Sequence, residues 1–204
     1  MSKLLIHGYP GTRAFRTLWM AEELGLDYEL VQLPFDETGV NSPEYRRINP
    51  NLRVPAIKDG DFTLWESLAI NLYLAKKHRK LYPATLEDEA RAWQWSFWAI
   101  SELEAPLLEW ALNDHVRAPD KRDPAIAAAA LDKLRRPFGV LDPVLSGGKY
   151  MLGDAFGVVD VNLASLMYRA LKMDPTAFPN VGRWLKACYA RPAAIKVRQM
   201  REAA

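Results

Sequence analysis

The fold of this chain is decided by residues 53–67, which read RVPAIKDGDFTLWES. Two short apolar runs, 54–58 and 62–65, flank an Asp-Gly pair, and Asp-Gly between apolar runs is the strongest short signal for a β-hairpin. Pro55 cannot donate a hydrogen bond within a sheet, so at a strand start it indicates a sheet edge or a cis peptide bond. The pair Glu66-Ser67 then opens a helix. We therefore predict a hairpin followed directly by a helix.

The residues before this hairpin alternate strand and helix signals. An apolar run at 3–7 and a second run at 28–33 predict two strands. Between them, apolar residues spaced by three and four positions from Phe15 predict a helix, and Gly25 is suited to its C-cap. A short helix is expected at 44–48. The first crossover makes a parallel pair and the hairpin adds antiparallel strands, so we predict a mixed four-stranded sheet with helices on its faces.

Strand signals stop after residue 83. A long apolar-rich helical segment is expected at 87–112, with Pro106 bending it. Further helices are expected at 124–145, 158–172 and 181–190. The length of 204 residues suits one or two domains. We predict an α/β domain in residues 1–80 and an all-α helical domain in residues 86–204.

Composition excludes several classes of protein. The chain is 50% hydrophobic and 25% charged, as globular proteins are. Its 27 basic and 25 acidic residues are spread evenly on both sides of residue 80, whereas nucleic-acid binding proteins usually concentrate basic charge. No stretch approaches the ~18 apolar residues of a membrane span, and a cytoplasmic location is the default expectation. The single cysteine, Cys188, rules out an internal disulfide and a cysteine metal cluster.

The loop from Gly8 to Arg13 lies between a predicted strand and a helix N-terminus. Free N–H groups and the helix dipole favour a negative charge there. Thr12 either caps the helix or offers its hydroxyl to an anionic ligand atom, and the loop alone leaves both open. His7 is expected to end the strand partly buried. It has no second His or Cys nearby, so no metal site is expected.

Two further segments are suited to a peptide ligand. A cis Val54-Pro55 bond would turn the Val54 backbone N–H and C=O outward, and Arg53 can hold a carboxylate. At the next helix N-terminus, Ser67 can take a carboxylate and Glu66 an ammonium group. The alternatives are a structural turn with a solvated Arg and a capping Ser beside a Glu. Taken together, the features fit the charges and backbone of glutathione.

At this point the sequence resembles the cytosolic glutathione S-transferases, in particular bacterial members of the serine/threonine or nu-like type. The resemblance runs over nearly the whole chain. It is carried by segments that match family motifs in order and spacing: RTLW at 16–19, EELG at 22–25, NPNLRVPA at 49–56, LWESLAI at 64–70, GDAFGVVD at 153–160 and RP at 191–192, which resembles a motif near the end of the last conserved helix.

The resemblance implies a thioredoxin-like domain joined to an all-α domain, usually in a homodimer, with glutathione as co-substrate. The implied activity is attack of the glutathione thiol on a small hydrophobic electrophile, as in detoxification. Val54 would pair with the cysteinyl backbone beside cis Pro55. The γ-glutamyl group would be held by Glu66 and Ser67. The glycine end of glutathione would contact Arg53 or Asn41.

The chain departs from the family pattern at the thiol-activating residue. His7 stands where the tyrosine type has its activator, Tyr9 follows two residues later, and Thr12 stands where the serine type has its hydroxyl. Cys188 lies too far along the chain for the cysteine type. We assign activation to Thr12, with Tyr9 and Arg13 as competitors. Two further departures are Leu52 in place of the usual glycine and Gly157 in place of a capping Ser or Thr.

Two other activities fit the same sequence. A glutathione-dependent disulfide reductase works without a protein cysteine, and a non-catalytic relative serves as an interaction protein. The peptide-binding edge at Arg53, Val54 and Glu66-Ser67 argues against the latter. Several tryptophans of the helical domain are expected to pack in its core, and Trp98 or Trp110 is the best candidate for substrate contact.

Overall fold

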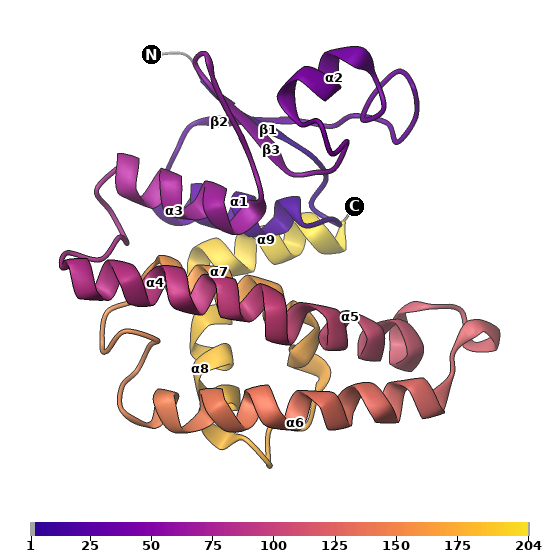
Figure 1. The fold of residues 1–204 in the computed structure, drawn as a ribbon, viewed down its shortest axis with the longest axis vertical. Coiled ribbons are helices and arrows are strands. Elements are labelled where there is room, and N and C mark those ends of the chain that lie inside the picture. The colour runs from indigo at the N-terminus through magenta and orange to yellow at the C-terminus, as the bar shows by residue number, and fades with distance from the viewer. Residues whose placement is uncertain (1–2, 204) are drawn as a thin grey trace. The chain divides into compact units, whose positions relative to one another are not determined.

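The computed structural model describes residues 3–203, which form two compact units (Figure 1). The first unit contains residues 3–82 together with 190–203, and the second contains residues 83–189. Residues 190–203 therefore pack with the first unit, whereas the sequence analysis assigned them to the helical domain. Within residues 3–203, no helix has both the length and the apolar character that crossing a membrane requires.

The first unit is built on a four-stranded mixed sheet, as predicted. Its strands are β1 (Leu4–His7), β2 (Tyr28–Val31), β3 (Ala56–Asp59) and β4 (Phe62–Trp65), in the order β2-β1-β3-β4. Strand β1 runs parallel to β2 and antiparallel to β3, which pairs antiparallel with β4. The hairpin turns tightly because Asp59 pairs with Phe62 and Gly60 supplies a positive φ of 64°.

Four helices complete this unit: α1 (Ala14–Leu24), α2 (Pro43–Ile48), α3 (Ser67–Lys77) and α9 (Pro192–Glu202). Helix α1 ends at Gly25, whose φ of 71° confirms the predicted C-cap. Trp19 of α1 and Leu74 of α3 are fully buried where the two helices pack. Helix α9 was not predicted: Arg191-Pro192 begins a helix, whereas the sequence analysis placed this pair near a helix end.

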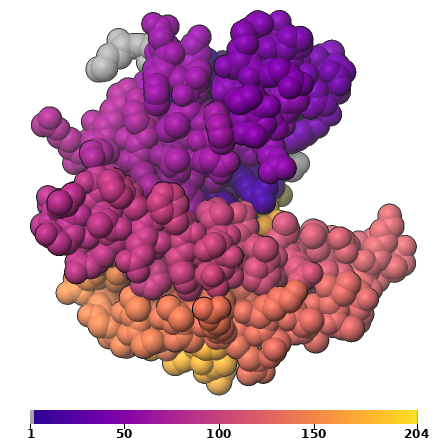
Figure 2. Space-filling view, viewed as in Figure 1, coloured from indigo at the N-terminus to yellow at the C-terminus, as the bar shows by residue number. Residues whose placement is uncertain are grey.

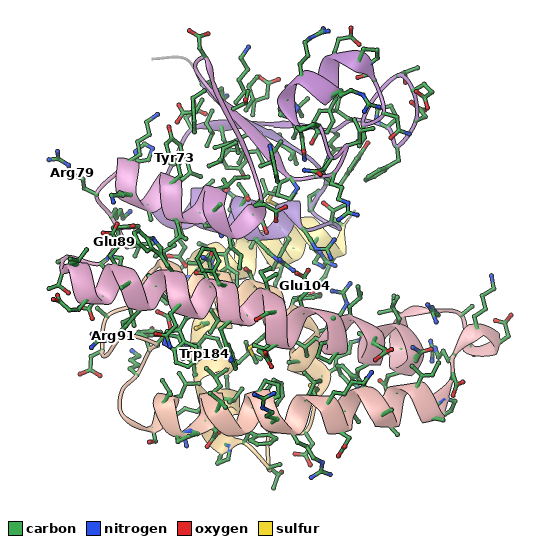
Figure 3. The ribbon with its side chains drawn as sticks, viewed as in Figure 1. Tyr73, Arg79, Glu89, Arg91, Glu104 and Trp184 are labelled. Atoms are coloured by element: carbon green, nitrogen blue, oxygen red, sulfur yellow. The ribbon has the colours of Figure 1, made fainter. Side chains whose placement is uncertain are left out.

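Helix α3 is tied to the hairpin by its C-terminal half. The hydroxyl of Tyr73, labelled in Figure 3, donates to Asp59 Oδ2 at 2.9 Å, and Lys77 forms an ion pair with the same carboxylate. The Tyr73 ring also lies 4.9 Å from that of Phe62. These contacts fix α3 relative to β3 and β4, and thereby fix the helix N-terminus at the opposite end of the sheet.

The second unit is helical, as predicted. Pro106 was expected to bend its first long helix, and the structure changes helical type just before this residue. The carbonyl of Glu102 has no N–H to accept from Pro106, and π-helical turns precede the proline. The segments of this unit are α4 (Leu86–Trp98), a π-helical stretch (Ala99–Glu104), α5 (Ala105–Ala111), a second π-helical stretch (Leu112–Val116), a 3₁₀ turn (Pro119–Lys121), α6 (Pro124–Ser146), α7 (Val158–Leu166), a 3₁₀ stretch (Met167–Lys172) and α8 (Pro179–Tyr189).

A buried carboxyl group organises the start of α7. Asp160 is 1% exposed and accepts hydrogen bonds from Met151 N, Gly157 N and Trp184 Nε1 at 2.9, 2.9 and 2.8 Å. Trp184 of α8 is labelled in Figure 3. Burial raises the pKa of Asp160 to about 6, although the three donors pull it the other way. Gly157 has no side chain, so only the Asp160 half of a capping box exists here.

Candidate glutathione site

The sheet brings three candidate segments to one end. His7 at the end of β1 pairs with Ala56 at the start of β3, and Ala56 pairs with Trp65 at the end of β4. The loop after β1, the segment before β3 and the turn after β4 therefore lie side by side. These three segments contain every candidate glutathione-binding or thiol-activating residue except Asn41. The register of the paired strands, rather than local propensity, brings these segments together.

Gly8 is the point where the first two segments meet. Its φ of 145° is unfavourable for any other residue, and a Cβ there would lie 2.6 Å from Ala14 Cβ and 3.3 Å from Val54 Cβ. The Thr12 hydroxyl oxygen is 3.7 Å from the same point. The missing side chain thus lets the helix α1 N-terminus, Thr12 and Val54 approach one another.

The Thr12 hydroxyl is engaged within its own loop. It donates to the Tyr9 carbonyl at 2.7 Å and accepts from the Ala14 N–H at 3.2 Å. The second bond lies just before α1, whose N-cap residue is Arg13 rather than Thr12. To donate to a ligand sulfur, this hydroxyl must rotate away from the Tyr9 carbonyl. Tyr9 is half-buried and Arg13 is exposed at the start of α1.

Tyr9 forms an aromatic pair with a residue that the sequence analysis did not single out. Its ring stacks on that of Phe35, with centroids 5.5 Å apart and an interplanar angle of 27°. Phe35 is 62% exposed, in the loop that follows β2. An exposed aromatic face therefore adjoins the loop that contains Thr12.

The Val54-Pro55 peptide bond is cis, as predicted. Arg53, which precedes this bond, is held through its backbone carbonyl by two buried side chains. Tyr45 Oη and Asn49 Nδ2 each donate to the Arg53 carbonyl at 2.7 Å. Asn49 Oδ1 also accepts the N–H of Asn51 at 3.0 Å. We call Tyr45 and Asn49 the carbonyl clamp.

The carbonyl clamp fixes the peptide group between Arg53 and Val54. The Val54 N–H belongs to the same peptide as the clamped carbonyl, so the clamp sets its direction. Burial raises the pKa of Tyr45 to about 12, which keeps its hydroxyl protonated and able to donate. Asn49 belongs to the motif at 49–56, but the sequence alone assigned no role to this residue. Its acceptor, the Arg53 carbonyl, comes within reach only in the folded loop.

Glu66 and Ser67 lie at the N-terminus of α3. Glu66 is exposed and has a φ of 72°, which is uncommon for a residue other than glycine and is most frequent at functional sites. Ser67 is buried, and its hydroxyl accepts from Arg16 Nη1 at 3.4 Å. Arg16 is itself buried, so a positive charge stands beside the Ser67 hydroxyl. The sequence analysis treated Arg16 only as part of a helix motif.

The remaining candidates lie around these segments. Arg53 is exposed beside the clamped carbonyl. Asn41 lies in the loop before α2, where its N–H donates to the Asp36 carbonyl at 3.0 Å. Trp110, offered as a substrate contact, is instead buried in a core cluster of the helical unit, and Trp98 is half-buried against Trp95.

His7 is buried more deeply than its sequence position suggested. Among residues 3–203 neither ring nitrogen has a hydrogen-bond partner, and the ring meets Tyr45 edge-on at 5.7 Å. Burial, and secondarily the charge of Lys58, lowers the pKa of His7. The imidazole is therefore neutral at physiological pH and packs beneath the site.

Comparison with known proteins identifies the family. Models of the glutathione S-transferase N-terminal and C-terminal domains match residues 2–76 and 104–192. Glutathione S-transferase GstB of Escherichia coli K12 is 33% identical over 193 residues, covering 91% of this chain and 92% of that protein. The crystal structure of the glutathione transferase URE2P5 from Phanerochaete chrysosporium has a TM-score of 0.88 at 27% identity, covering 100% of this chain and 96% of that one.

A second solved structure is similar at nearly the same level. A glutathione transferase from Burkholderia graminis, with two glutathione molecules bound per subunit, has a TM-score of 0.83 at 27% identity and covers 96% of this chain and 87% of its own. The matched family models, the similar proteins and the two structural units, thioredoxin-like and helical, all indicate the same family. The chain belongs to the glutathione S-transferase family.

Proposed function

We propose that this protein is a glutathione transferase that binds glutathione as co-substrate and activates its thiol for attack on a small hydrophobic electrophile. The observation that carries the proposal is the meeting, at one end of the sheet, of a cis-proline segment and two helix N-termini. The first offers backbone groups for an extended peptide, and the helices favour anionic groups.

Each part of glutathione has a partner in this proposal. The Val54 backbone pairs with the cysteinyl residue as an added strand, beside Pro55. The γ-glutamyl carboxylate accepts from the Ser67 hydroxyl, whose oxygen already accepts from Arg16, and the carboxylate is attracted by the Arg16 charge. Glu66 holds the ammonium group, and Arg53 or Asn41 meets the glycine carboxylate. Glutathione bound to the Burkholderia graminis relative supports this ligand for the present chain.

The sulfur is placed at the N-terminus of α1. A free thiol of pKa about 8.5 is mostly protonated at neutral pH, and a helix N-terminus stabilises the thiolate. Thr12 is the proposed hydroxyl donor, once its bond to the Tyr9 carbonyl is exchanged for one to the sulfur. The thiolate then forms a bond with the electrophilic carbon, the leaving group departs with its electron pair, and the thiol proton passes to water.

Three variants separate the possible activators. The bound thiol is titrated by its ultraviolet thiolate absorbance in Thr12→Val, Tyr9→Phe and Arg13→Ala. If Thr12 is the donor, only its replacement raises the apparent thiol pKa substantially. Each unit of that rise corresponds to a loss of ~1.4 kcal/mol in stabilisation of the thiolate. A larger rise in the Tyr9 or Arg13 variant would move the assignment to that residue while leaving the binding site in place.

The exposed Tyr9–Phe35 pair is the proposed contact for an apolar or aromatic electrophile. A direct test mixes the protein and glutathione with an activated aryl halide, and separately with a mixed disulfide of glutathione. Conjugate formation that falls in Ser67→Ala, but not in the exposed-serine control Ser101→Ala, supports the transferase. Reduction of the disulfide alone would indicate a reductase, and binding without either reaction would indicate an interaction protein.

We propose a homodimer as the assembled form. Along one face of α4 and the π-helical stretch after it, Trp93, Phe97 and Ile100 are 42%, 71% and 41% exposed. A contiguous apolar face of this kind marks a protein–protein contact. The surface of α4, in magenta-pink, adjoins that of α6 in the helical unit in Figure 2.

A cytoplasmic location stays a prediction.

A further inference from the structure

The C-terminal helix reaches the loop that would hold the sulfur. Arg201 of α9 donates from Nη1 to the carbonyls of Pro10 and Thr12, at 2.9 and 3.3 Å. Its guanidinium group lies 5.4 Å from the centre of the Phe15 ring, in the first turn of α1. One side chain, 189 residues away in sequence from Thr12, thus binds two carbonyls of a single short loop.

Helix α9, which contains Arg201, is also held against α1 by other residues. Arg191 at the start of α9 makes two hydrogen bonds of 2.7 Å to the Glu23 carboxylate, and Lys196 lies 2.8 Å from Glu22. Both acceptors are on α1. These ion pairs hold α9 against α1, so the helix has anchors on α1 besides Arg201.

The contact to Pro10 orients one peptide of the loop, and the contact to Thr12 adds to the bond that the Thr12 carbonyl accepts from the Phe15 N–H at 3.2 Å. In a planar trans peptide the C=O of one residue and the N–H of the next point in opposite directions. Because the Pro10 and Thr12 carbonyls face Arg201, the N–H groups of Gly11 and Arg13 face away from α9. Gly11 and Arg13 are the exposed residues of the loop.

We propose that Arg201 is a positioning residue for thiol ionisation: it turns the Pro10 carbonyl away from the sulfur and the Gly11 N–H toward it. The inference rests on the proposed function, because the sulfur is placed by that proposal. Without Arg201 the Pro10–Gly11 peptide is able to rotate and present its carbonyl oxygen to the thiolate, whereas the Thr12 carbonyl keeps its bond from the Phe15 N–H at 3.2 Å. Like-signed partial charges disfavour the ionised form, so the thiol pKa rises.

The test uses Arg201→Met, Arg201→Lys and the matched control Lys196→Met, which removes a charge and an ion pair from the same helix without touching the loop. The first measurement is amide hydrogen exchange of residues 9–13 by NMR in the ligand-free protein. Exchange of the Thr12 N–H, bonded to the Tyr9 carbonyl at 3.0 Å, is expected to accelerate at least about tenfold in Arg201→Met. Lys196→Met is expected to stay within about twofold of wild type.

The second measurement is the apparent pKa of the bound glutathione thiol. It is expected to rise by about one unit in Arg201→Met, a tenfold loss of thiolate well below the pKa. Affinity for S-methylglutathione, which has no thiol to ionise, should stay almost unchanged. Arg201→Lys keeps the charge but ends short of the Nη1 position that makes both contacts, and should restore no more than about half of the shift.

Three results would overturn the proposal. Unchanged loop exchange in Arg201→Met would show that the loop does not depend on this side chain. Equal pKa shifts in Arg201→Met and Lys196→Met would show a general effect of charge, and full rescue by Arg201→Lys would show that a positive charge near the loop is sufficient. Failure of wild type to bind glutathione would refute the proposed function instead, and the exchange measurement would still decide whether Arg201 positions the loop.

Discussion

Removing the carbonyl clamp tests how the backbone at Val54 is prepared for a ligand. Asn49→Ala removes two hydrogen bonds, to the Arg53 carbonyl at 2.7 Å and from the Asn51 N–H at 3.0 Å. At a net ~1 kcal/mol for each bond, the loop loses ~2 kcal/mol of preference for its observed conformation. If binding must restore that conformation, glutathione affinity falls by up to about 30-fold.

Tyr45→Phe removes only one bond to the same carbonyl, so ~1 kcal/mol and about fivefold are expected. In the double variant the Arg53 carbonyl loses both donors, so the combined loss should exceed the sum of the single losses. The assay is isothermal titration calorimetry with glutathione, accompanied by urea unfolding of each variant.

The matched control for this experiment is Tyr73→Phe. Its hydroxyl binds Asp59 at 2.9 Å, at the opposite end of the sheet from the cis-proline segment. Stability should fall by a similar amount in Tyr73→Phe and Tyr45→Phe, but only the latter should weaken glutathione binding. Wild-type affinity in Asn49→Ala and Tyr45→Phe would refute the reasoning.

Three further predictions concern the ligand head group, a buried acid and assembly. Ser67→Ala removes a hydrogen bond to a charged group, so glutathione affinity should fall by ~1.5–3 kcal/mol, and unchanged calorimetric affinity would contradict that role. Because burial raises the pKa of Asp160 to about 6 from its usual value near 4, the folded helical unit binds this proton more tightly than the unfolded chain does. Its contribution to stability is therefore full below pH ~4 and falls by ~3 kcal/mol as the pH rises through 6, and an Asp160 carboxyl resonance titrating below pH 4 would contradict it. Phe97→Glu places a charge on the exposed face of α4, so sedimentation should show monomers at a concentration where wild type is dimeric, whereas identical behaviour would exclude this face.

Local sequence signals were sufficient for most of the first unit. Asp-Gly between two apolar runs predicted the hairpin, and Gly25 marked the end of α1, because both signals depend on backbone preferences of one or two residues. The chemistry of Pro55 left a sheet edge and a cis bond open, and the resemblance to the family favoured the cis bond that the structure contains. These features need no knowledge of distant parts of the chain.

Contacts between distant residues were not accessible in the same way. Helix α9 buries only Ala194 and Val197 and has no clear apolar stripe, so its sequence gives little helix signal. It docks through ion pairs such as Lys196 with Glu22, 174 positions away. The engagement of the Thr12 hydroxyl by the Tyr9 carbonyl also depends on the loop conformation, which residue type alone does not fix.

The most direct test of the account is the ionisation state of bound glutathione. Ultraviolet difference spectra of protein with saturating glutathione, recorded across pH 5 to 9, measure the thiolate and its apparent pKa. The account predicts a thiolate band at neutral pH and a thiol pKa below the free value of about 8.5, because the sulfur lies at the α1 N-terminus. Glutathione that binds with its thiol still titrating near 8.5, or that does not bind at all, would contradict it.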